Sequence, residues 1–223
     1  MRSIIIIVVF LFLAQAVRTQ SKLGFEQYSY MGAGQLNTLV PVAHYESGKK
    51  WYTEARYNYE DLQTFSLYAG KTFSRENDFS YAFTPMIGGM VGKLKGGSVG
   101  LNTAFSFRNF NFSSQSQYSV SADAQANNFF FSWSELYYQP LDWMYTGVSL
   151  QHTQVYMTNA LVEPGLLIGF SFNHWTFPIY SFSPFGSERY FVVGINWEWK
   201  HLKSQHKKLD PRELTKATEL VTQ

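Results

Sequence analysis

Residues 51–60 read WYTEARYNYE, and this stretch decides the fold class. Its side chains fall into two alternating sets. The first set is Trp51, Thr53, Ala55, Tyr57 and Tyr59, and the second is Tyr52, Glu54, Arg56, Asn58 and Glu60. A period of two is the pattern of a β-strand, whose successive side chains point to opposite sides of a sheet. The stretch therefore predicts a strand with one largely aromatic face and one polar, charged face.

The same alternation returns along most of the chain, at residues 65–73, 99–107, 110–120 and 191–199. One face is apolar, and the other is mostly Gly, Ser, Asn and Gln. A strand facing bulk water would carry many Lys and Glu residues, so this composition favours a confined polar interior. Segments of about 10 residues with an apolar outside and a polar inside are typical of transmembrane β-barrels.

The composition agrees with dispersed hydrophobicity. Aromatic residues make up 18% of the chain and charged residues 15%, against about 25% charged in an average protein. The chain has no cysteine, which excludes a disulfide scaffold, a thiolate metal site and a cysteine nucleophile. The net charge of +2 gives no reason to expect nucleic acid as a partner.

The N-terminus has the pattern of an export signal. Arg2 precedes an uninterrupted apolar run from Ile4 to Leu13, and Ala14-Gln15-Ala16 supplies the small residues of a cleavage site. The run is shorter than the roughly 20 residues of a membrane-spanning helix. We expect residues 1–16 to be a signal peptide and residues 17–200 to form an outer-membrane β-barrel. An N-terminal membrane anchor is the alternative.

The turn signals divide the barrel into twelve expected antiparallel strands in up-and-down order, with ten as the alternative because the region before Ser47 alternates poorly and contains Pro41. The expected strands are 24–31, 36–46, 51–60, 63–73, 79–91, 97–107, 110–121, 128–138, 143–156, 163–173, 175–182 and 189–200. The shorter connections, at 47–50, 74–78, 108–109, 139–142 and 173–174, all fall on one side. Outer-membrane barrels keep short turns on the periplasmic side.

Residues 201–223 follow the last expected strand as a periplasmic tail. Asp210-Pro211-Arg212-Glu213 has the pattern of a helix start, and an apolar stripe runs from Leu214 to Val221. Such a short helix is only marginally stable on its own, so the sequence allows either a helical or a disordered tail. A helical tail would lie on the inner leaflet or contact a periplasmic partner.

No motif in the chain predicts catalysis, a metal site or a cofactor. Residues 96–100 match G-x-S-x-G, but a glycine-rich turn leading into another strand lacks the strand–turn–helix context of a nucleophile elbow. Ser149 and His152 have opposite strand parity, and His152 is expected several rungs from Glu135, so they do not predict a triad. His44 and His174 stand alone, without metal-ligand spacing.

The candidate functional residues line the expected lumen and its rims. A charge facing lipid at mid-depth costs about 2–4 kcal/mol, so Glu54 and Arg56 are expected to point inward. They would form either a structural ion-pair network or a charged ring lining a pore, and barrel closure would add Glu26. The lumen-lining candidates are Tyr52, Glu54, Arg56, Asn58, Glu60, Asn196 and Glu198; the candidates for an aromatic girdle at the membrane interface are Trp51, Tyr59, Trp143, Trp175, Trp197 and Trp199.

With its export signal, the stretch 51–59 and the stretch YFVVGINWEW at 190–199, the chain resembles small outer-membrane β-barrel proteins of Gram-negative bacteria. The resemblance implies a β-barrel fold and a location in the outer membrane, with the lipid bilayer and the outer-membrane insertion machinery as partners. It implies no reaction.

Three functions stay open at this point. The first is a narrow channel, or a structural surface protein, with a polar lumen. The second is an outer-membrane hydrolase acting on lipid or peptide, and the third is a soluble exported barrel whose apolar face points inward and binds an apolar ligand.

Overall fold

The computed structural model describes residues 21–32 and 38–201, and almost all of them belong to one antiparallel sheet. Its strands are β1 (Ser21–Gly32), β2 (Thr38–Glu46), β3 (Trp51–Tyr57), β4 (Thr64–Lys71), β5 (Phe73–Arg75), β6 (Phe79–Gly92), β7 (Gly96–Phe107), β8 (Phe110–Ser121), β9 (Phe129–Leu141), β10 (Met144–Val155), β11 (Leu161–Phe172), β12 (Trp175–Phe182) and β13 (Tyr190–His201). The expected signal peptide lies outside the described residues, as does the expected tail apart from His201, which ends β13.

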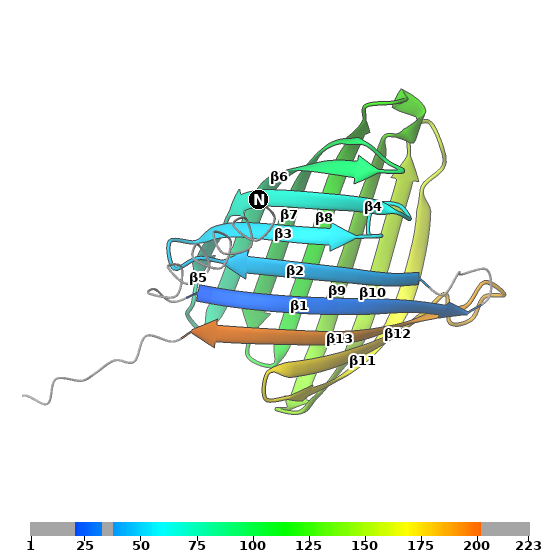
Figure 1. Ribbon diagram of the computed structural model, residues 1–223. Coiled ribbons are helices and arrows are strands. Elements are labelled where there is room, and N and C mark those ends of the chain that lie inside the picture. Colours follow the sequence, from blue (N-terminus) through cyan, green and yellow to red (C-terminus); the bar gives the residue numbers. More distant parts are fainter. Residues whose placement is uncertain (1–20, 33–37, 202–223) are drawn as a thin grey trace, which may run out of the picture.

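The strands pair with their neighbours all the way around, so that the sheet closes into a ring. The first strand pairs with the last, from Ser21 opposite His201 to Gly32 opposite Tyr190. Both β4 and β5 pair with β6, and only Thr72 separates them, so they form one interrupted strand. The result is a closed barrel of twelve antiparallel strands (Figure 1), which confirms the predicted fold class and the larger of the two predicted strand numbers.

The connections at the two ends of the barrel differ in length. Residues 47–50, 76–78, 108–109, 142–143 and 173–174 connect strands at the end where β1 starts and β13 finishes; we call this the turn end. The opposite, loop end carries residues 58–63, 93–95, 122–128, 156–160 and 183–189, including a short 3-10 turn at Gln125–Asn127. This distribution confirms the predicted division into short and longer connections.

The strand expected over 51–60 ends early, at Tyr57. Asn58 takes a φ of 59°, and its side chain accepts a hydrogen bond from the Gln63 backbone N–H and donates one to the Leu39 carbonyl. An asparagine tolerates this left-handed conformation and can bond its own turn. Asn58 is thus a turn residue at the loop end, not the lumen-wall residue that strict alternation predicted.

The outer wall of the barrel is apolar. Along β4, Phe65 and Leu67 are 44% and 56% exposed, whereas Thr64, Ser66 and Tyr68 on the other face are buried inside the barrel. Ile87 on β6 is 69% exposed. This orientation corrects the third hypothesis, because a soluble barrel holding an apolar ligand would turn this face inward.

The outer wall also has a polar interruption that the alternation did not reveal. Ser114 and Ser116 on β8 share the outward face of Phe112 and Tyr118, and Ser114 pairs across the ladder with Ser134. The Ser114 and Ser134 hydroxyl oxygens lie 2.9 Å apart. Pairing hydroxyls with each other lowers the cost of placing them on an apolar wall.

The interior is more aromatic than the Gly- and Ser-rich inner face predicted. Inward glycines lie directly opposite large inward side chains on the next strand, in the pairs Tyr68–Gly88, Tyr145–Gly169, Phe182–Gly165, Tyr137–Gly147 and Tyr28–Gly194. A Cβ at Gly169 would lie 2.0 Å from the Tyr145 ring. The glycines therefore make room for rings, and only part of the lumen is polar.

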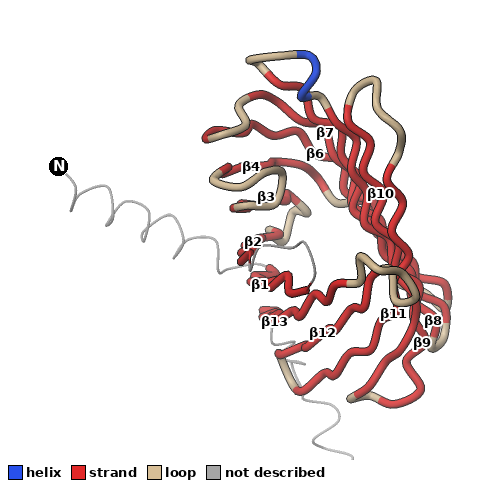
Figure 2. The backbone as a smooth tube through the Cα atoms, turned by 90° about the vertical axis from the view of Figure 1, so that its right-hand side faces the viewer, coloured by secondary structure: helices blue, strands red, loops and turns tan. Residues whose placement is uncertain are grey.

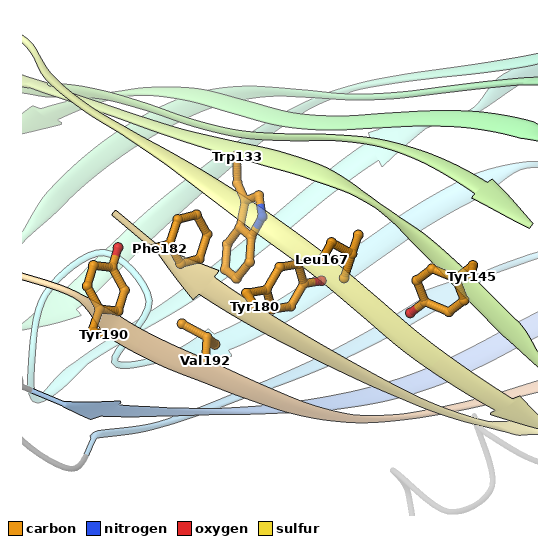
Figure 3. Close-up of a cluster of buried hydrophobic side chains, with 7 residues drawn as sticks. All are labelled: Trp133, Tyr145, Leu167, Tyr180, Phe182, Tyr190 and Val192. Carbon is orange, nitrogen blue, oxygen red and sulfur yellow. The ribbon is translucent and has the colours of Figure 1, made fainter. Parts of the chain in front are cut away.

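Two of these rings, Tyr145 and Phe182, belong to a hydrophobic cluster along β9–β13, which comprises Trp133, Tyr145, Leu167, Tyr180, Phe182, Tyr190 and Val192 (Figure 3). Figure 2 shows the wall curving around the interior, with β1–β4 and β13 on one side and β6–β10 on the other. No helix among the described residues is long and apolar enough to span a membrane.

Candidate functional site in the barrel lumen

A buried ion-pair network occupies the lumen near the loop end. Arg56 on β3 pairs through Nε with Glu54, through Nη1 with Glu60 at 3.2 Å, and also donates from Nη1 to the Gln117 side-chain oxygen on β8. The side chains of Glu54, Arg56 and Glu60 are at most 1% exposed. Because β4, β6 and β7 separate β3 from β8 around the wall, the Arg56–Gln117 contact crosses the lumen.

Hydroxyl groups satisfy the remaining carboxylate oxygens of this network. The Tyr52 hydroxyl donates to Glu54, the Ser66 hydroxyl to Glu60 at 2.7 Å, and the Tyr68 hydroxyl to Glu60 at 3.0 Å. The Arg56 guanidinium also lies over the rings of Tyr59 and Tyr68, at 4.3 and 4.4 Å from their centroids. One guanidinium thus serves two carboxylates, and every charged group has several partners.

A cavity of about 810 Å³ lies in the lumen beside this network, and we call it the vestibule. Asn173 and His174 of a short turn, with Glu198 and Lys200 near the end of β13, mark its mouth at the turn end. Its inner limit includes Tyr59, which donates a hydrogen bond to Gln115 at 2.7 Å and packs edge-on against Phe131. The cavity therefore extends from the turn end to the Tyr59 ring, which also covers Arg56.

The vestibule wall carries more negative than positive charge. Glu26, Glu135 and Glu198 line it, and Lys200 is its one lining residue with a permanent positive charge. Lys200 pairs with Glu198 at 2.9 Å, which leaves Glu26 and Glu135 deeper inside. His44 Nδ1 lies 3.5 Å from Glu26, whereas no ion pair within the described residues involves Glu135.

Three aromatic rings connect these two deep carboxylates. The Tyr28 hydroxyl donates to Glu26 at 2.7 Å, and the Tyr180 hydroxyl donates to Glu135 at 2.7 Å. Trp133 stands between them, with ring centroids 5.4 Å from Tyr28 and 5.0 Å from Tyr180. The order Glu26, Tyr28, Trp133, Tyr180, Glu135 runs from β1 through β9 and β12 and back to β9. Figure 3 shows the Trp133 and Tyr180 rings of this series.

The structure brings the predicted lumen residues into two groups. Tyr52, Glu54, Arg56 and Glu60 meet in the network, Glu60 reaching it from the loop after β3. Asn196 and Glu198 line the vestibule, where Asn196 lies opposite Glu26 across the β1–β13 seam.

The predicted girdle residues also divide. Trp51, Trp143, Trp175, Trp197 and Trp199 all lie in or near the turn end, and Trp175 pairs directly with Trp197 across the ladder. Tyr59 does not belong with them, because its ring covers Arg56 inside the barrel. The reason is the early end of β3, which turns Tyr59 back into the lumen.

The residues considered for hydrolysis do not meet. Ser149 lies directly opposite Glu135, but His152 is three residues further along β10, on the outward face, where its ring packs against Phe130. Ser98 of the G-x-S-x-G match lies within β7 and donates to the Tyr118 carbonyl at 3.1 Å. Within the described residues no group of His, Asp and Glu side chains is placed to hold a metal ion.

Sequence reasoning did not single out Tyr28, Trp133 and Tyr180. A signal for Trp133 was present, because Phe131, Trp133, Glu135 and Tyr137 share one face of a strand, and the charge of Glu135 requires that face to point inward. The aromatic residues were instead assigned to the lipid side.

Comparison with known proteins supports the architecture. No protein-family model matches the chain, and no curated protein matches it. Among solved structures, the KdgM porin, also solved in complex with disordered oligogalacturonate, superposes with a TM-score of 0.54 at 9% identity, covering 79% of this chain and 98% of that one. OccAB4 of Acinetobacter baumannii gives a TM-score of 0.46 at 10% identity, covering 78% of this chain and 57% of that one.

The fold is therefore that of the outer-membrane β-barrel porins. At this identity the likeness concerns the fold, and function has to be argued from the lumen itself.

Proposed function

We propose that the protein is a narrow outer-membrane channel that favours cations and is restricted at its loop end by the Arg56 network. The observation that carries this proposal is the vestibule, which opens at the turn end and has two carboxylates, Glu26 and Glu135, deep in its wall. A lumen with excess carboxylate raises the local concentration of cations and lowers that of anions.

The outer wall supports insertion into a bilayer. Phe65, Leu67 and Ile87 belong to a wide set of apolar side chains that are exposed on the described barrel. Monomeric soluble proteins rarely expose contiguous apolar surface beyond a few hundred Å², whereas a membrane-spanning barrel needs it. The tryptophans at the turn end suit one membrane–water interface, which for short turns is the periplasmic one.

The network supports restriction of the pore. Its contacts join β3 to β8 across the lumen, and its ring contacts continue through Tyr59 to Phe131 on β9. Water and small ions would pass only through gaps between these side chains, so we expect a small single-channel conductance that rises when the cross-lumen contacts are removed.

Conductance in planar lipid bilayers tests the proposal. Purified protein should give small, cation-favouring current steps, and Gln117→Ala should increase their size because it removes the cross-lumen acceptor while leaving Arg56 paired with Glu54 and Glu60. Ser80→Ala, outside the lumen network, is the matched control. A shift in gel mobility on boiling shows that each variant is folded before it is measured.

Absence of current from the folded wild type and from folded Gln117→Ala would contradict the channel and favour a structural barrel. Recovery of the protein in the soluble fraction would contradict the membrane location as well.

A further inference from the structure

The inner wall of the vestibule brings aromatic rings and carboxylates together. Tyr28, Trp133 and Tyr180 stand side by side, and a carboxylate bonds to the hydroxyl at each end of the series. The faces of aromatic rings attract cations, and a nearby carboxylate strengthens that attraction at a site shielded from water. Such an arrangement suits an ammonium group.

The charge balance of this wall is incomplete. Arg56 is already shared by Glu54 and Glu60, and Lys200 pairs with Glu198 at the mouth. Among the described residues, Glu135 has its hydrogen bond from Tyr180 and no cationic partner within ion-pair distance. A carboxylate in a confined site is costly without a counter-charge, so a bound cation would stabilise it.

Two other polar atoms of this wall are covered by the protein itself. Trp133 is only 7% exposed, and its indole N–H has no hydrogen-bond acceptor in the described structure. Asn196 donates weakly to the Tyr28 hydroxyl at 3.4 Å, while its side-chain oxygen has no donor.

Neither atom is accessible from the vestibule, so neither can bond a ligand there. What this wall requires of a ligand is the positive charge that Glu135 lacks.

We infer that the vestibule binds a small protonated primary amine. Its ammonium group lies within reach of Glu135, beside the series of rings formed by Tyr28, Trp133 and Tyr180. The cavity of about 810 Å³ falls in the range of about 300–1,000 Å³ that is usual for small-molecule sites. The inference deepens the proposed channel by naming a class of solute, and it rests on that proposal only for how the solute arrives.

Binding by the full chain in detergent tests the inference without requiring conduction. Glucosamine at neutral pH is the probe, and N-acetylglucosamine is the matched neutral sugar; both are titrated by isothermal calorimetry. We expect glucosamine to bind at least about tenfold more tightly, and Glu135→Gln to weaken its binding by about tenfold. Glu188→Gln, a matched change in the exposed loop 183–189, should leave the affinity unchanged.

Three results would overturn the inference. They are equal affinity for the two sugars, equal affinity of wild type and folded Glu135→Gln for glucosamine, and no heat of binding for glucosamine at millimolar concentration. Tyr180→Phe, which keeps the ring and the charge, gives a second reading should Glu135→Gln fail to fold. Binding without current would leave the site intact and contradict only the channel; current without binding would do the reverse.

Discussion

Both halves of the lumen bury glutamates, but the glutamates have different partners in the two halves. In the network at the loop end, Glu54 and Glu60 share Arg56 and receive further hydrogen bonds from Tyr52, Ser66 and Tyr68. In the vestibule, Glu135 has one bond, from Tyr180, and no cationic partner among the described residues. A charge-paired network rigidifies a barrel, whereas a carboxylate without a counter-charge on a cavity wall is suited to a cationic solute.

The largest effect should follow from removing the centre of the network. Arg56→Ala leaves Glu54 and Glu60 buried together without a counter-charge, and breaking a buried pair in this way typically costs about 3–5 kcal/mol. Urea unfolding of the barrel in detergent or lipid, followed by tryptophan fluorescence, measures the loss of unfolding free energy. A loss below about 1 kcal/mol would mean that the network does not hold the loop end together.

A smaller loss is expected from Glu60→Gln. The amide keeps one acceptor but places an N–H₂ group where Arg56, Ser66 or Tyr68 now donates, and a buried unsatisfied group costs about 1–3 kcal/mol. The same unfolding experiment checks it. Tyr52→Phe is the companion variant, since it removes only one donor to Glu54.

In the vestibule, Tyr180→Phe should cost only about 1 kcal/mol, because water in the open cavity can replace the lost hydroxyl at Glu135. The ring contact with Trp133 is kept. A loss of 3 kcal/mol or more, about the loss from Arg56→Ala, would show that the vestibule wall is as tightly coupled as the network and would remove the contrast between the two regions.

The smallest effect on stability is expected from Glu135→Gln. Replacing an unpaired carboxylate by an amide removes the cost of confining a charge, so the unfolding free energy should stay equal or rise slightly. Comparing this variant with Glu60→Gln sets the same chemical change in the two regions side by side. Equal destabilisation by both substitutions would contradict the contrast.

Most of the barrel could be predicted from the sequence because a closed sheet in a membrane separates two environments strictly. The alternation at 51–60 and the placement of short turns predict twelve strands with ten as the alternative, the closure of the first strand on the last, and the inward position of Glu54 and Arg56; the structure has twelve strands, pairs β1 with β13 and buries both residues. Charge is the strongest such signal, since it is expensive on a lipid-facing wall.

Aromatic residues were harder to assign, because a ring is acceptable in lipid and inside the lumen alike. Tyr59 was placed at the interface but covers Arg56, and Trp133 was not recognised as part of a site. Cross-strand register decides whether a ring has room inside the barrel, as Tyr145 has opposite Gly169. Register depends on the conformation of each turn, which the sequence alone does not fix.

The reversal potential in a KCl gradient reports the sign of the charge that passing ions meet, and so tests whether the vestibule carboxylates select cations. We expect a potential of the sign set by K⁺ moving down its gradient for the wild type, reduced in Glu135→Gln and unchanged in Glu188→Gln. A wild-type potential of zero, or one of the sign set by Cl⁻, would contradict it.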